Sequence, residues 1–426
     1  MKRVINNNTP PSADRGFGRM DYIKVNIFGF ALNALWNPMS TTIMPLLVLN
    51  FVAESQKNTY LGIITFLGLV LAIIVQPVAG TISDRSTFTW GRRRPYILLG
   101  SILSILLLMS MGFASSLIAV LLIYCLLQIS SNIAHGPWQG FIPDLVPDNK
   151  RGIASGVKGI LELLGAVVGI QLVGYFLSQR FIAEEATKQF LALGMIAIIM
   201  LGAMLATILT VKEKPGLGGT KFSIVQTLHN TFKIDVKTNT SFVFFLVSRF
   251  LFLMPLIVVR TFGLYFLKDV VEIADPVAMT SDLMVVVGVS ILVVVYPAGH
   301  LADRIGRRPI VIASGLIGAL GFVILLLFHT YFHIMLAGAL LGIANGGFMS
   351  ASWAMATDLV TKGEEARYLG LTNLATGGAC AIAAFAGPII DLLNVYGANL
   401  GYQIVMLSCI IFSVVSSLLV LKIKTR

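Results

Sequence analysis

One expected helix, residues 117–143, carries four polar side chains at helical spacing: Gln128, Asn132, His135 and Gln139. Steps of 4, 7 and 11 residues from the first, at about 100° per residue, keep all four on one helix face. Amides and imidazole both donate and accept hydrogen bonds, which suits them to the hydroxyl groups of a sugar. Inside a membrane such a stripe must face protein or water. It therefore either lines a solute pathway or joins neighbouring helices by hydrogen bonds.

A weaker stripe lies in the expected helix 27–51, where Asn33, Asn37 and Ser40 share a face and Trp36 lies beside them. An aromatic ring next to amides can stack on the apolar face of a sugar ring. The alternative is that Trp36 packs against a neighbouring helix and that Asn26, on the same face, is only interfacial. The second half of the chain offers similar binding candidates: Asn345, Trp353, Asn373 and Thr376.

Four charged residues fall inside apolar segments: Lys158, Glu162, Arg249 and Arg260. Glu162 lies ten residues past Gly152, or about 15 Å at 1.5 Å per residue, which places it near the middle of a membrane. A carboxyl group at that depth is a candidate proton-binding site for coupled transport. Lys158, four residues earlier on the same face, can form a permanent pair with Glu162, or can release it during a transport cycle. A third possibility is that Glu162 faces Arg249.

Arg249 and Arg260 are eleven residues apart in the expected helix 241–267 and share a face. We expect Arg249 to extend toward the membrane surface and Arg260 to pair with Asp282. Three embedded cations against one carboxylate leave room for a negatively charged solute.

Composition places these residues in a membrane protein. Of the 426 residues, 56% are hydrophobic and 12% are charged, against roughly a quarter charged in soluble domains. A soluble enzyme and a disordered chain are both excluded. We expect an all-α protein with twelve transmembrane helices at 27–51, 60–82, 95–114, 117–143, 152–178, 190–211, 241–267, 281–302, 309–330, 332–359, 368–393 and 400–423.

The formal charge of +11 is distributed asymmetrically over the expected loops. About 24 Lys and Arg lie on one side and about four on the other, as the positive-inside rule describes. Both termini are therefore expected in the cytoplasm, in a plasma membrane or a bacterial inner membrane, and the lipid bilayer rather than nucleic acid explains the charge. The three cysteines lie inside spans, and no metal-spaced cluster or P-loop occurs. We expect no disulfide, metal or cofactor, and no enzyme activity.

The two halves of the chain repeat each other. PVAGTISDRSTFTWGRRRPYILLGS precedes the third span and YPAGHLADRIGRRPIVIASG precedes the ninth. Asp144 and Asp358 are 214 residues apart, as are Gly156 and Gly370. We expect two six-helix bundles, 25–211 and 241–423, with cytoplasmic segments at 1–24, 212–240 and 424–426. Parallel repeats of this kind are similar to the two halves of the major facilitator superfamily.

The repeated loops combine carboxylates, glycine turns and arginines at one membrane surface. Arginines can bridge to carboxylates and to carbonyl groups at helix ends, so the loops can close one side of a carrier, or can merely set its orientation. The expected gate residues are Asp84, Arg85, Arg92, Arg93, Asp144, Arg151, Asp303, Arg304, Arg307, Arg308, Asp358 and Arg367.

The segments DRSTFTWGRRRPYI and LLQISSNIAHGPWQGFIPDL resemble sucrose/proton symporters and the related glycoside–pentoside–hexuronide cation symporters. The resemblance implies a sugar carrier coupled to a cation, and Gly136, Pro137 and Asp144 match the family pattern. Two positions depart from it. The family's aspartate for proton coupling is Gln128 here, and its substrate-binding arginine is Gln139. Neither side chain can carry a charge, which moves the question of coupling to Glu162.

We therefore expect a twelve-helix secondary active transporter that moves a sugar or glycoside by alternating access, with protons as the expected coupling ion. The alternatives are an efflux pump for amphipathic drugs, a carrier of organic anions, and a non-transporting membrane sensor or assembly factor. A weakly polar central space would favour drugs, an inward-facing Arg260 would favour anions, and a sealed interior without a polar stripe would favour a sensor.

Overall fold

The computed structural model describes residues 17–213, 240–359 and 365–423, and every regular element in these ranges is a helix. Eleven helices in this described part are long and apolar enough to cross a membrane. The first half contains α1 Arg19–Pro38, η1 Met39–Ile43, α2 Met44–Phe51, η2 Glu54–Gln56, α3 Lys57–Asp84, α4 Arg94–Ser110, η3 Met111–Phe113, α5 Leu117–Gln139, α6 Phe141–Leu145, η4 Asp148–Lys150, α7 Arg151–Leu177 and α8 Glu185–Thr210. The second half contains α10 Thr240–Asp269, α11 Pro276–Ile305, α12 Arg307–Leu327, α13 Tyr331–Leu359, α14 Glu365–Ala383, α15 Ala386–Asn394 and α16 Leu400–Leu421.

The expected tail 1–24 is described only from residue 17, and the expected loop 212–240 only at its two ends. Most of that loop and residues 424–426 lie outside the described part of the chain.

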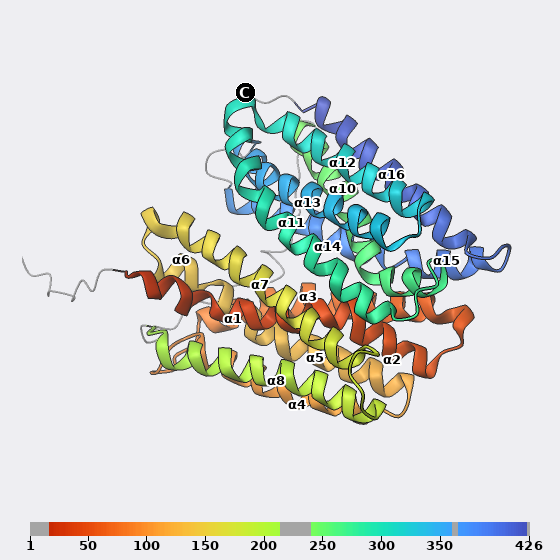
Figure 1. Ribbon diagram of the computed structural model, residues 1–426. Coiled ribbons are helices and arrows are strands. Elements are labelled where there is room, and N and C mark those ends of the chain that lie inside the picture. Colours follow the sequence, from red (N-terminus) through yellow and green to blue (C-terminus); the bar gives the residue numbers. More distant parts are fainter. Residues whose placement is uncertain (1–16, 214–239, 360–364, 424–426) are drawn as a thin grey trace, which may run out of the picture.

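The helices form two bundles with the same internal arrangement. In the first, α1 packs against α7 and α8, while α5 packs against α3 and α4. In the second, α10 packs against α14 and α16, while α13 packs against α11 and α12. Each bundle therefore repeats the same neighbours in the same chain order, and Figure 1 shows the two bundles stacked one above the other. This is the pseudo-symmetric fold that the sequence repeat predicts.

The first span is longer and less regular than expected. Its helix begins at Arg19 rather than near residue 27, because the Asp21 side chain accepts a hydrogen bond from the Gly18 N–H and satisfies the free end of the helix. A five-residue π-helix, Met39–Ile43, follows Pro38 and separates α1 from α2. Together α1, η1 and α2 form the first expected span in three consecutive pieces, in addition to the eleven helices described above.

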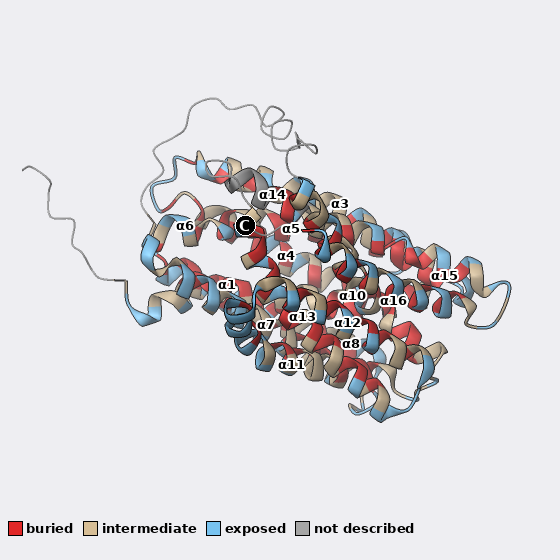
Figure 2. Ribbon diagram, turned by 90° about the horizontal axis from the view of Figure 1, so that it is seen from above, coloured by how far each residue is buried: buried red, intermediate tan, exposed pale blue. Residues whose placement is uncertain are grey.

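Apolar side chains cover the outside of both bundles. Leu106, Leu126, Leu209 and Leu418 are each at least half exposed, which suits a surface that faces lipid rather than water. Figure 2 shows buried residues along the sides of the helices that face one another, with intermediate and exposed residues on the outer sides.

The two bundles meet at one end of the molecule. Figure 1 shows them converging where α2 and α15 lie and diverging toward α6. Between the bundles, α3 contacts α14 and α15, and α7 contacts α11. We call the end that carries residues 83–94, 143–151 and 303–308 the basic face, and the other end the opposite face.

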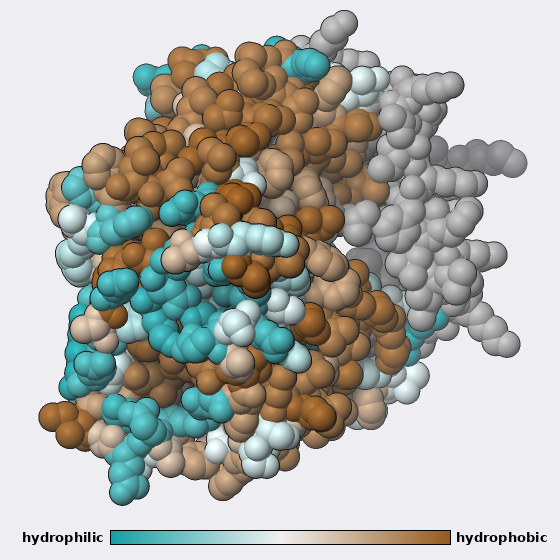
Figure 3. Space-filling model, turned by 90° about the vertical axis from the view of Figure 1, so that its right-hand side faces the viewer, coloured by the Kyte–Doolittle hydropathy of each residue, from teal (hydrophilic) through white to brown (hydrophobic). Residues whose placement is uncertain are grey.

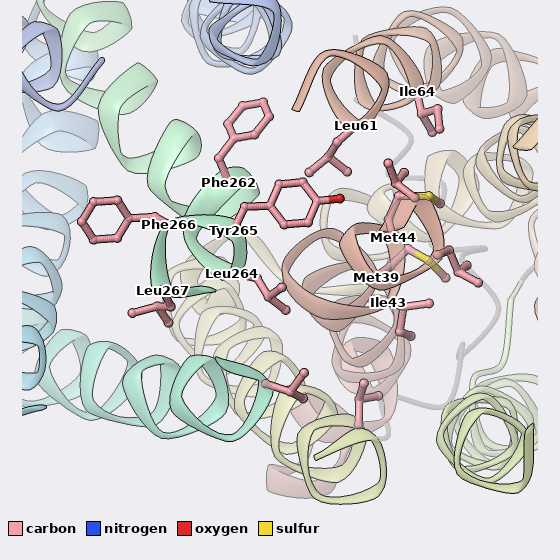
Figure 4. Close-up of a cluster of buried hydrophobic side chains, with 14 of the residues drawn as sticks. Met39, Ile43, Met44, Leu61, Ile64, Phe262, Leu264, Tyr265, Phe266 and Leu267 are labelled. Carbon is pink, nitrogen blue, oxygen red and sulfur yellow. The ribbon is translucent and has the colours of Figure 1, made fainter. Parts of the chain in front are cut away.

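The largest hydrophobic cluster joins the bundles near the opposite face. Tyr265 of α10 is fully buried, and its hydroxyl donates to the Pro45 carbonyl of α2 at 2.7 Å. In Figure 4 this ring points toward the helix that carries Met39 and Met44. A buried hydroxyl with a hydrogen-bond partner fixes the separation of the two bundles at this point.

Candidate transport pathway and gates

The polar stripe on α5 forms two hydrogen-bonded groups along the helix, Tyr124–Gln128–Asn132 and His135–Gln139. Gln128 and Asn132 are buried; the Asn132 amide donates to the Gln128 carbonyl at 2.8 Å, and the Gln128 amide bonds to the Tyr124 hydroxyl at 3.2 Å. Nearer the basic face, the Gln139 amide and the His135 ring lie 3.1 Å apart. The structure therefore places all four predicted residues in one line and adds Tyr124 to it.

The stripe on α1 is bonded mainly within its own helix. The Asn33 amide donates to the Gly29 carbonyl at 3.0 Å, and the Asn37 amide donates to Asn33. The Trp36 ring meets the Tyr124 ring of α5 edge-on, with centroids 5.9 Å apart. This contact brings the two predicted stripes together at one level of the first bundle.

Asn26 is fully buried, and its amide donates to the Ala154 carbonyl of α7 at 3.0 Å. Asn26 therefore joins two helices of the first bundle.

Lys158 and Glu162 form a loose pair on α7. The Lys158 ammonium lies 3.8 Å from the Glu162 carboxylate, and each side chain is about a quarter to a third exposed. The same ammonium lies 4.8 Å from the centre of the Trp138 ring. Its attraction is thus shared between a carboxylate and an aromatic face, so the ion pair is weaker than a close contact would be.

Arg249 is buried in the second bundle and contacts only neutral groups among the described residues. Its guanidinium donates to the Ser352 hydroxyl at 2.7 Å and to the Thr376 hydroxyl at 3.2 Å, and lies 5.2 Å from the Trp353 ring. Arg249 therefore does not extend to the membrane surface as expected, because hydroxyls on two neighbouring helices bind it in place. In this conformation it also does not pair with Glu162.

Arg260 does not pair with Asp282. Asp282 instead receives two hydrogen bonds from Arg180, at 2.7 and 3.3 Å. Arg260 is exposed and forms no hydrogen bond or ion pair with any described residue. It lies close enough to Tyr124 and Cys380 to act on both electrostatically, so its charge reaches residues of both bundles.

The remaining second-half candidates are not brought together into one site. Asn345 is partly buried on α13, Trp353 is 39% exposed beside Arg249, and Asn373 is exposed on α14. Trp353 is the candidate among these three with a defined polar neighbour.

The first loop motif binds parts of its own bundle. Arg93 is buried; its guanidinium donates to the Pro137 carbonyl at 2.9 Å and pairs with Asp84 and Asp144, each at 2.7 Å. Arg92 also pairs with Asp144. Arg151 pairs with Asp148 and donates to a carbonyl of α6. Arg85 interacts with its surroundings as well.

The second loop motif repeats part of this pattern. Arg307 pairs with Asp358 and donates to the Ala354 carbonyl. Asp303 and Arg304 are exposed, and Arg308 is partly buried without a hydrogen-bond or ion-pair partner in the described part of the chain. The side chain of Arg367 lies outside the described residues.

The ion pairs of Asp84, Asp144, Asp148 and Asp358 at the basic face each join residues of the same bundle. In this conformation these pairs therefore stabilise each bundle separately.

Sequence reasoning missed a carboxylate at the basic face. One oxygen of Glu213 accepts hydrogen bonds from the backbone N–H groups of Arg93 and Arg94 at 3.1 and 3.0 Å. Glu213 comes shortly after α8 in a segment expected to be a plain loop, and nothing in its spacing marks it as a partner of the motif.

A network at the opposite face was also missed. We define the opposite-face network as Glu54, Lys57, Asn58, Asp269, Asp391 and Tyr402. The Lys57 ammonium lies 2.7 Å from Asp269 and 2.6 Å from Glu54, and the Tyr402 hydroxyl donates to Asp269 at 2.8 Å. Lys268 pairs with Glu54 across the bundles. Figure 3, which views this end, shows hydrophilic residues gathered within a hydrophobic surround.

Asp391 ties the start of α3 to the second bundle. Its carboxylate accepts from the Thr59 backbone N–H at 2.6 Å and from the Asn58 amide at 2.9 Å. A carboxylate at a helix N-terminus satisfies free N–H groups and interacts favourably with the helix dipole. Asp391 is only 8% exposed, so this contact is an ionic hydrogen bond shielded from water. Its sequence signal was a single acidic residue at the end of an apolar span.

Glycines let α3 and α15 approach closely enough for this contact. A Cβ atom on Gly62 would lie 2.3 Å from the Ala384 carbonyl oxygen, and one on Gly387 would lie 2.1 Å from the Asn58 carbonyl oxygen. Both distances are shorter than any non-bonded contact, so the closed opposite face depends on the absence of side chains at these positions.

Comparison with known proteins gives the family. The family model described as MFS/sugar transport protein matches residues 28–368. An uncharacterised MFS-type transporter of Methanocaldococcus jannaschii is 22% identical over 83% of this chain and 85% of its own length. A sucrose transport protein of Oryza sativa subsp. japonica is 30% identical over 24% of this chain, and solute carrier family 45 member 4 of Mus musculus is 26% identical over 34%. The chain spans 23% and 21% of the lengths of these last two relatives.

Solved structures of transporters have a similar fold. A D-xylose–proton symporter superposes with a TM-score of 0.75 at 15% identity, covering 96% of this chain and 100% of that one. The nucleoside transporter NupG gives a TM-score of 0.72 at 15% identity, covering 94% and 98%. Since the family model covers most of the chain and eleven described helices are long and apolar enough to cross a membrane, this multi-pass chain belongs to the MFS/sugar transport protein family.

Proposed function

We propose that this transporter carries a sugar or glycoside together with protons, by alternating access between the bundles 25–211 and 241–423. The basic face lies in the cytoplasm in this proposal, because the positive-inside rule assigns the Arg- and Lys-rich surface to that side. The membrane is then a plasma membrane or a bacterial inner membrane. The conformation described here is closed at the opposite face, so it corresponds to a carrier that faces inward.

The polar stripe on α5 carries the solute proposal. Tyr124, Gln128, Asn132, His135 and Gln139 offer donors and acceptors along one helix face, and Trp36 adds an aromatic surface beside Tyr124. A sugar presents hydroxyl groups that both donate and accept, together with an apolar ring face. Amides and an aromatic ring meet both requirements without a fixed charge. The names of the family and of the rice relative point to the same class of solute.

Glu162 is the proposed proton-coupling group. It is an acidic residue within a span whose charge partner, Lys158, is 3.8 Å away and shared with Trp138. A carboxylate with a weak partner changes protonation more readily than one in a close pair, because less Coulomb energy is lost. The resemblance to sucrose symporters aligns their charged positions with Gln128 and Gln139. Neither amide can bind or release a proton, so the proton-coupling role passes to a residue outside α5.

Uptake into proteoliposomes tests the proposal. We expect a panel of radiolabelled sugars to show at least one that accumulates when an inward proton gradient is imposed. Glu162→Gln should abolish accumulation against a gradient but retain exchange. Glu184→Gln, which changes an exposed acid outside the span, should behave as wild type. Sugar movement that ignores the gradient, or a Glu162→Gln variant that still concentrates the solute, would contradict proton coupling through Glu162.

A substitution at Gln139 tests the proposed solute site. Gln139→Ala should weaken affinity for the transported sugar while leaving the folded protein intact. Unchanged affinity would assign the part of the stripe nearer the basic face a purely structural role.

A carrier of organic anions is the second candidate, and Arg260 favours it. This guanidinium is exposed, has no charge partner in the described part of the chain, and acts on residues of both bundles. Uptake of neutral sugars and organic acids of similar size separates the two candidates. An anion carrier should prefer the acids and lose that preference in Arg260→Gln, whereas a neutral-sugar carrier should not.

A further inference from the structure

Three helices of the first bundle meet at the Trp138 ring. Trp138 of α5 is 2% exposed, and its indole N–H donates to the Val25 carbonyl of α1 at 2.9 Å. A Cβ atom on Gly29 of α1 would lie 2.6 Å from this ring and 3.3 Å from the Glu162 side chain of α7. The glycine therefore lets the ring and Glu162 lie against the same point of α1, and the hydrogen bond fixes the ring there.

The Lys158 ammonium has two partners at this junction. It lies 3.8 Å from the Glu162 carboxylate and 4.8 Å from the centre of the Trp138 ring. A cation is attracted to the face of an indole ring, more strongly where water is excluded. At these distances a small displacement moves the ammonium fully over the ring. The carboxylate and the ring therefore compete for one cation.

The second bundle repeats the junction without a carboxylate. Ser352 lies 214 residues after Trp138, which is the spacing of the sequence repeat. Thr376 lies 214 residues after Glu162. Arg249 of α10, the helix that corresponds to α1, donates to these two hydroxyls at 2.7 and 3.2 Å. A neutral hydroxyl thus stands where the first bundle has the Glu162 carboxylate.

The cation of the second junction is held by aromatic rings and hydroxyls. The Arg249 guanidinium lies 5.2 Å from the centre of the Trp353 ring and 5.9 Å from that of the Phe348 ring, and Arg249 is 7% exposed. This junction therefore shows how a buried cation is accommodated beside a neutral side chain. A proton on Glu162 creates the same situation in the first bundle.

His135 of α5 is a further titratable group beside the first junction. Its ring lies 5.6 Å from the Trp138 ring, centre to centre, and Lys158 acts on it electrostatically. The helices α1, α8 and α11 also pack against α7, and their charged residues lie near the helix ends. The charged residues of α6 and η4 lie at the basic face. A test of the junction must therefore separate Trp138 from His135.

We propose that Trp138 is a positioning residue for proton coupling, which takes the Lys158 ammonium when Glu162 binds a proton and returns it when the proton leaves. This rests on the proposed role of Glu162. Without the ring, protonation of Glu162 would leave the ammonium with no partner at the junction. Trp138 thus makes protonation of Glu162 less costly and sets the pH range in which the carrier takes up its proton.

Labelling of Glu162 with dicyclohexylcarbodiimide in the purified full chain tests this without a transported solute. The reagent reacts with protonated carboxyl groups, and mass spectrometry of the peptide that contains Glu162 gives the labelled fraction at each pH. We expect half-maximal labelling of Trp138→Leu at a pH lower by roughly half to one unit, which is the contribution of a partly desolvated cation–π contact. Trp138→Phe, which keeps a ring, should shift the midpoint by less. Trp90→Leu, which removes an exposed ring beside Arg94, should match wild type.

Substitution of Lys158 separates a positioning role from a structural one. In a Lys158→Gln background, Trp138→Leu should cause no further shift, because no cation remains to be placed. In a His135→Gln background the shift should persist. Equal midpoints for wild type and Trp138→Leu, or the same shift in the Lys158→Gln background, would overturn the proposal.

Sugar uptake measured on the same variants distinguishes this failure from failure of the proposed function. Uptake that ignores the proton gradient contradicts proton coupling through Glu162, and the role of Trp138 in coupling fails with it. A gradient-driven uptake whose pH dependence is the same in wild type and Trp138→Leu, together with unshifted labelling, contradicts the role of Trp138 alone.

Discussion

At the scale of single residues, Glu213 has a titration that can be measured. Burial raises the pKa of its carboxyl above the ordinary value of 4.5, and the N–H groups of Arg94 and Arg93 and the nearby arginine charges oppose that rise. The folded protein thus binds this proton more tightly than the unfolded chain does. The stabilisation that results is present below about pH 4.5 and is lost as the pH rises through the raised pKa.

Glu213→Gln should remove this pH dependence. The midpoint of thermal unfolding of wild type relative to the variant should fall as the pH rises above about 4.5, because the carboxyl group of wild type ionises and the amide of the variant cannot. Since burial is the dominant effect on the carboxylate, we expect the variant to fold. A wild-type midpoint that rises relative to the variant over this range would show that the ionised form is the favoured one.

Asp391 joins the two bundles at the closed opposite face. Asp391→Asn removes the charge from hydrogen bonds to the Thr59 N–H and the Asn58 amide. Hydrogen bonds to charged groups contribute about 2 kcal/mol, so the balance should move toward opening this face by roughly 30-fold. A cysteine introduced beside Thr59 should react faster with a thiol reagent in Asp391→Asn than in the protein with Asp391. Equally slow labelling in both proteins would show that Asp391 does not hold the face closed.

At the scale of elements, the close crossing of α3 and α15 is part of the contact between the bundles at the opposite face. Gly62→Ala places a Cβ 2.3 Å from the Ala384 carbonyl oxygen, and a backbone atom cannot rotate away. Overpacking of this kind costs about 1–3 kcal/mol. The cost falls only on the conformation in which the two helices touch.

We therefore expect Gly62→Ala to disfavour the closed opposite face and to slow transport without unfolding either bundle. Gly194→Ala is the matched control, because a Cβ on Gly194 of α8 meets nothing within 4 Å. Spin labels on α3 and α15 should report a greater separation in Gly62→Ala alone. The same separation in both variants would mean that the bundles accommodate the added methyl group.

Elements were more predictable from the sequence than contacts were. Apolar length located the spans, so that 400–423 matches α16, Leu400–Leu421, closely. The π-helix Met39–Ile43 was not predicted, because hydropathy does not distinguish one kind of helix from another. Helical spacing placed Gln128, Asn132, His135 and Gln139 on one face, which the hydrogen bonds along α5 bear out. It could not show that their neighbours include Tyr124 and Trp36.

At the scale of the whole molecule, the contacts that join the bundles were the part that sequence could not supply. The pairing of Arg260 with Asp282 was wrong because charge and proximity in the chain do not identify a partner, and Arg180, 102 residues away, takes that place. Lys57 and Asp269 meet across 212 positions, and nothing in their spacing indicates that contact. Periodicity describes the face of one helix, whereas the docking of two bundles depends on surfaces that are far apart in the sequence.

A double-mutant cycle tests whether Lys57 and Asp269 act as one contact between the bundles. The Lys57 side chain is 4% exposed and that of Asp269 is 21% exposed, so water screens this pair less than it screens a surface ion pair. Lys57→Ala and Asp269→Ala should each favour opening of the opposite face, measured by the distance between spin labels at Thr59 and Asn394. The double variant should open it by less than the sum of the two, with a coupling of about 1–2 kcal/mol.

Lys24→Ala with Asp21→Ala, a pair within α1, should leave the distance unchanged. Strictly additive effects of Lys57→Ala and Asp269→Ala would mean that the two residues stabilise the closed face separately, Lys57 through Glu54 and Asp269 through Tyr402.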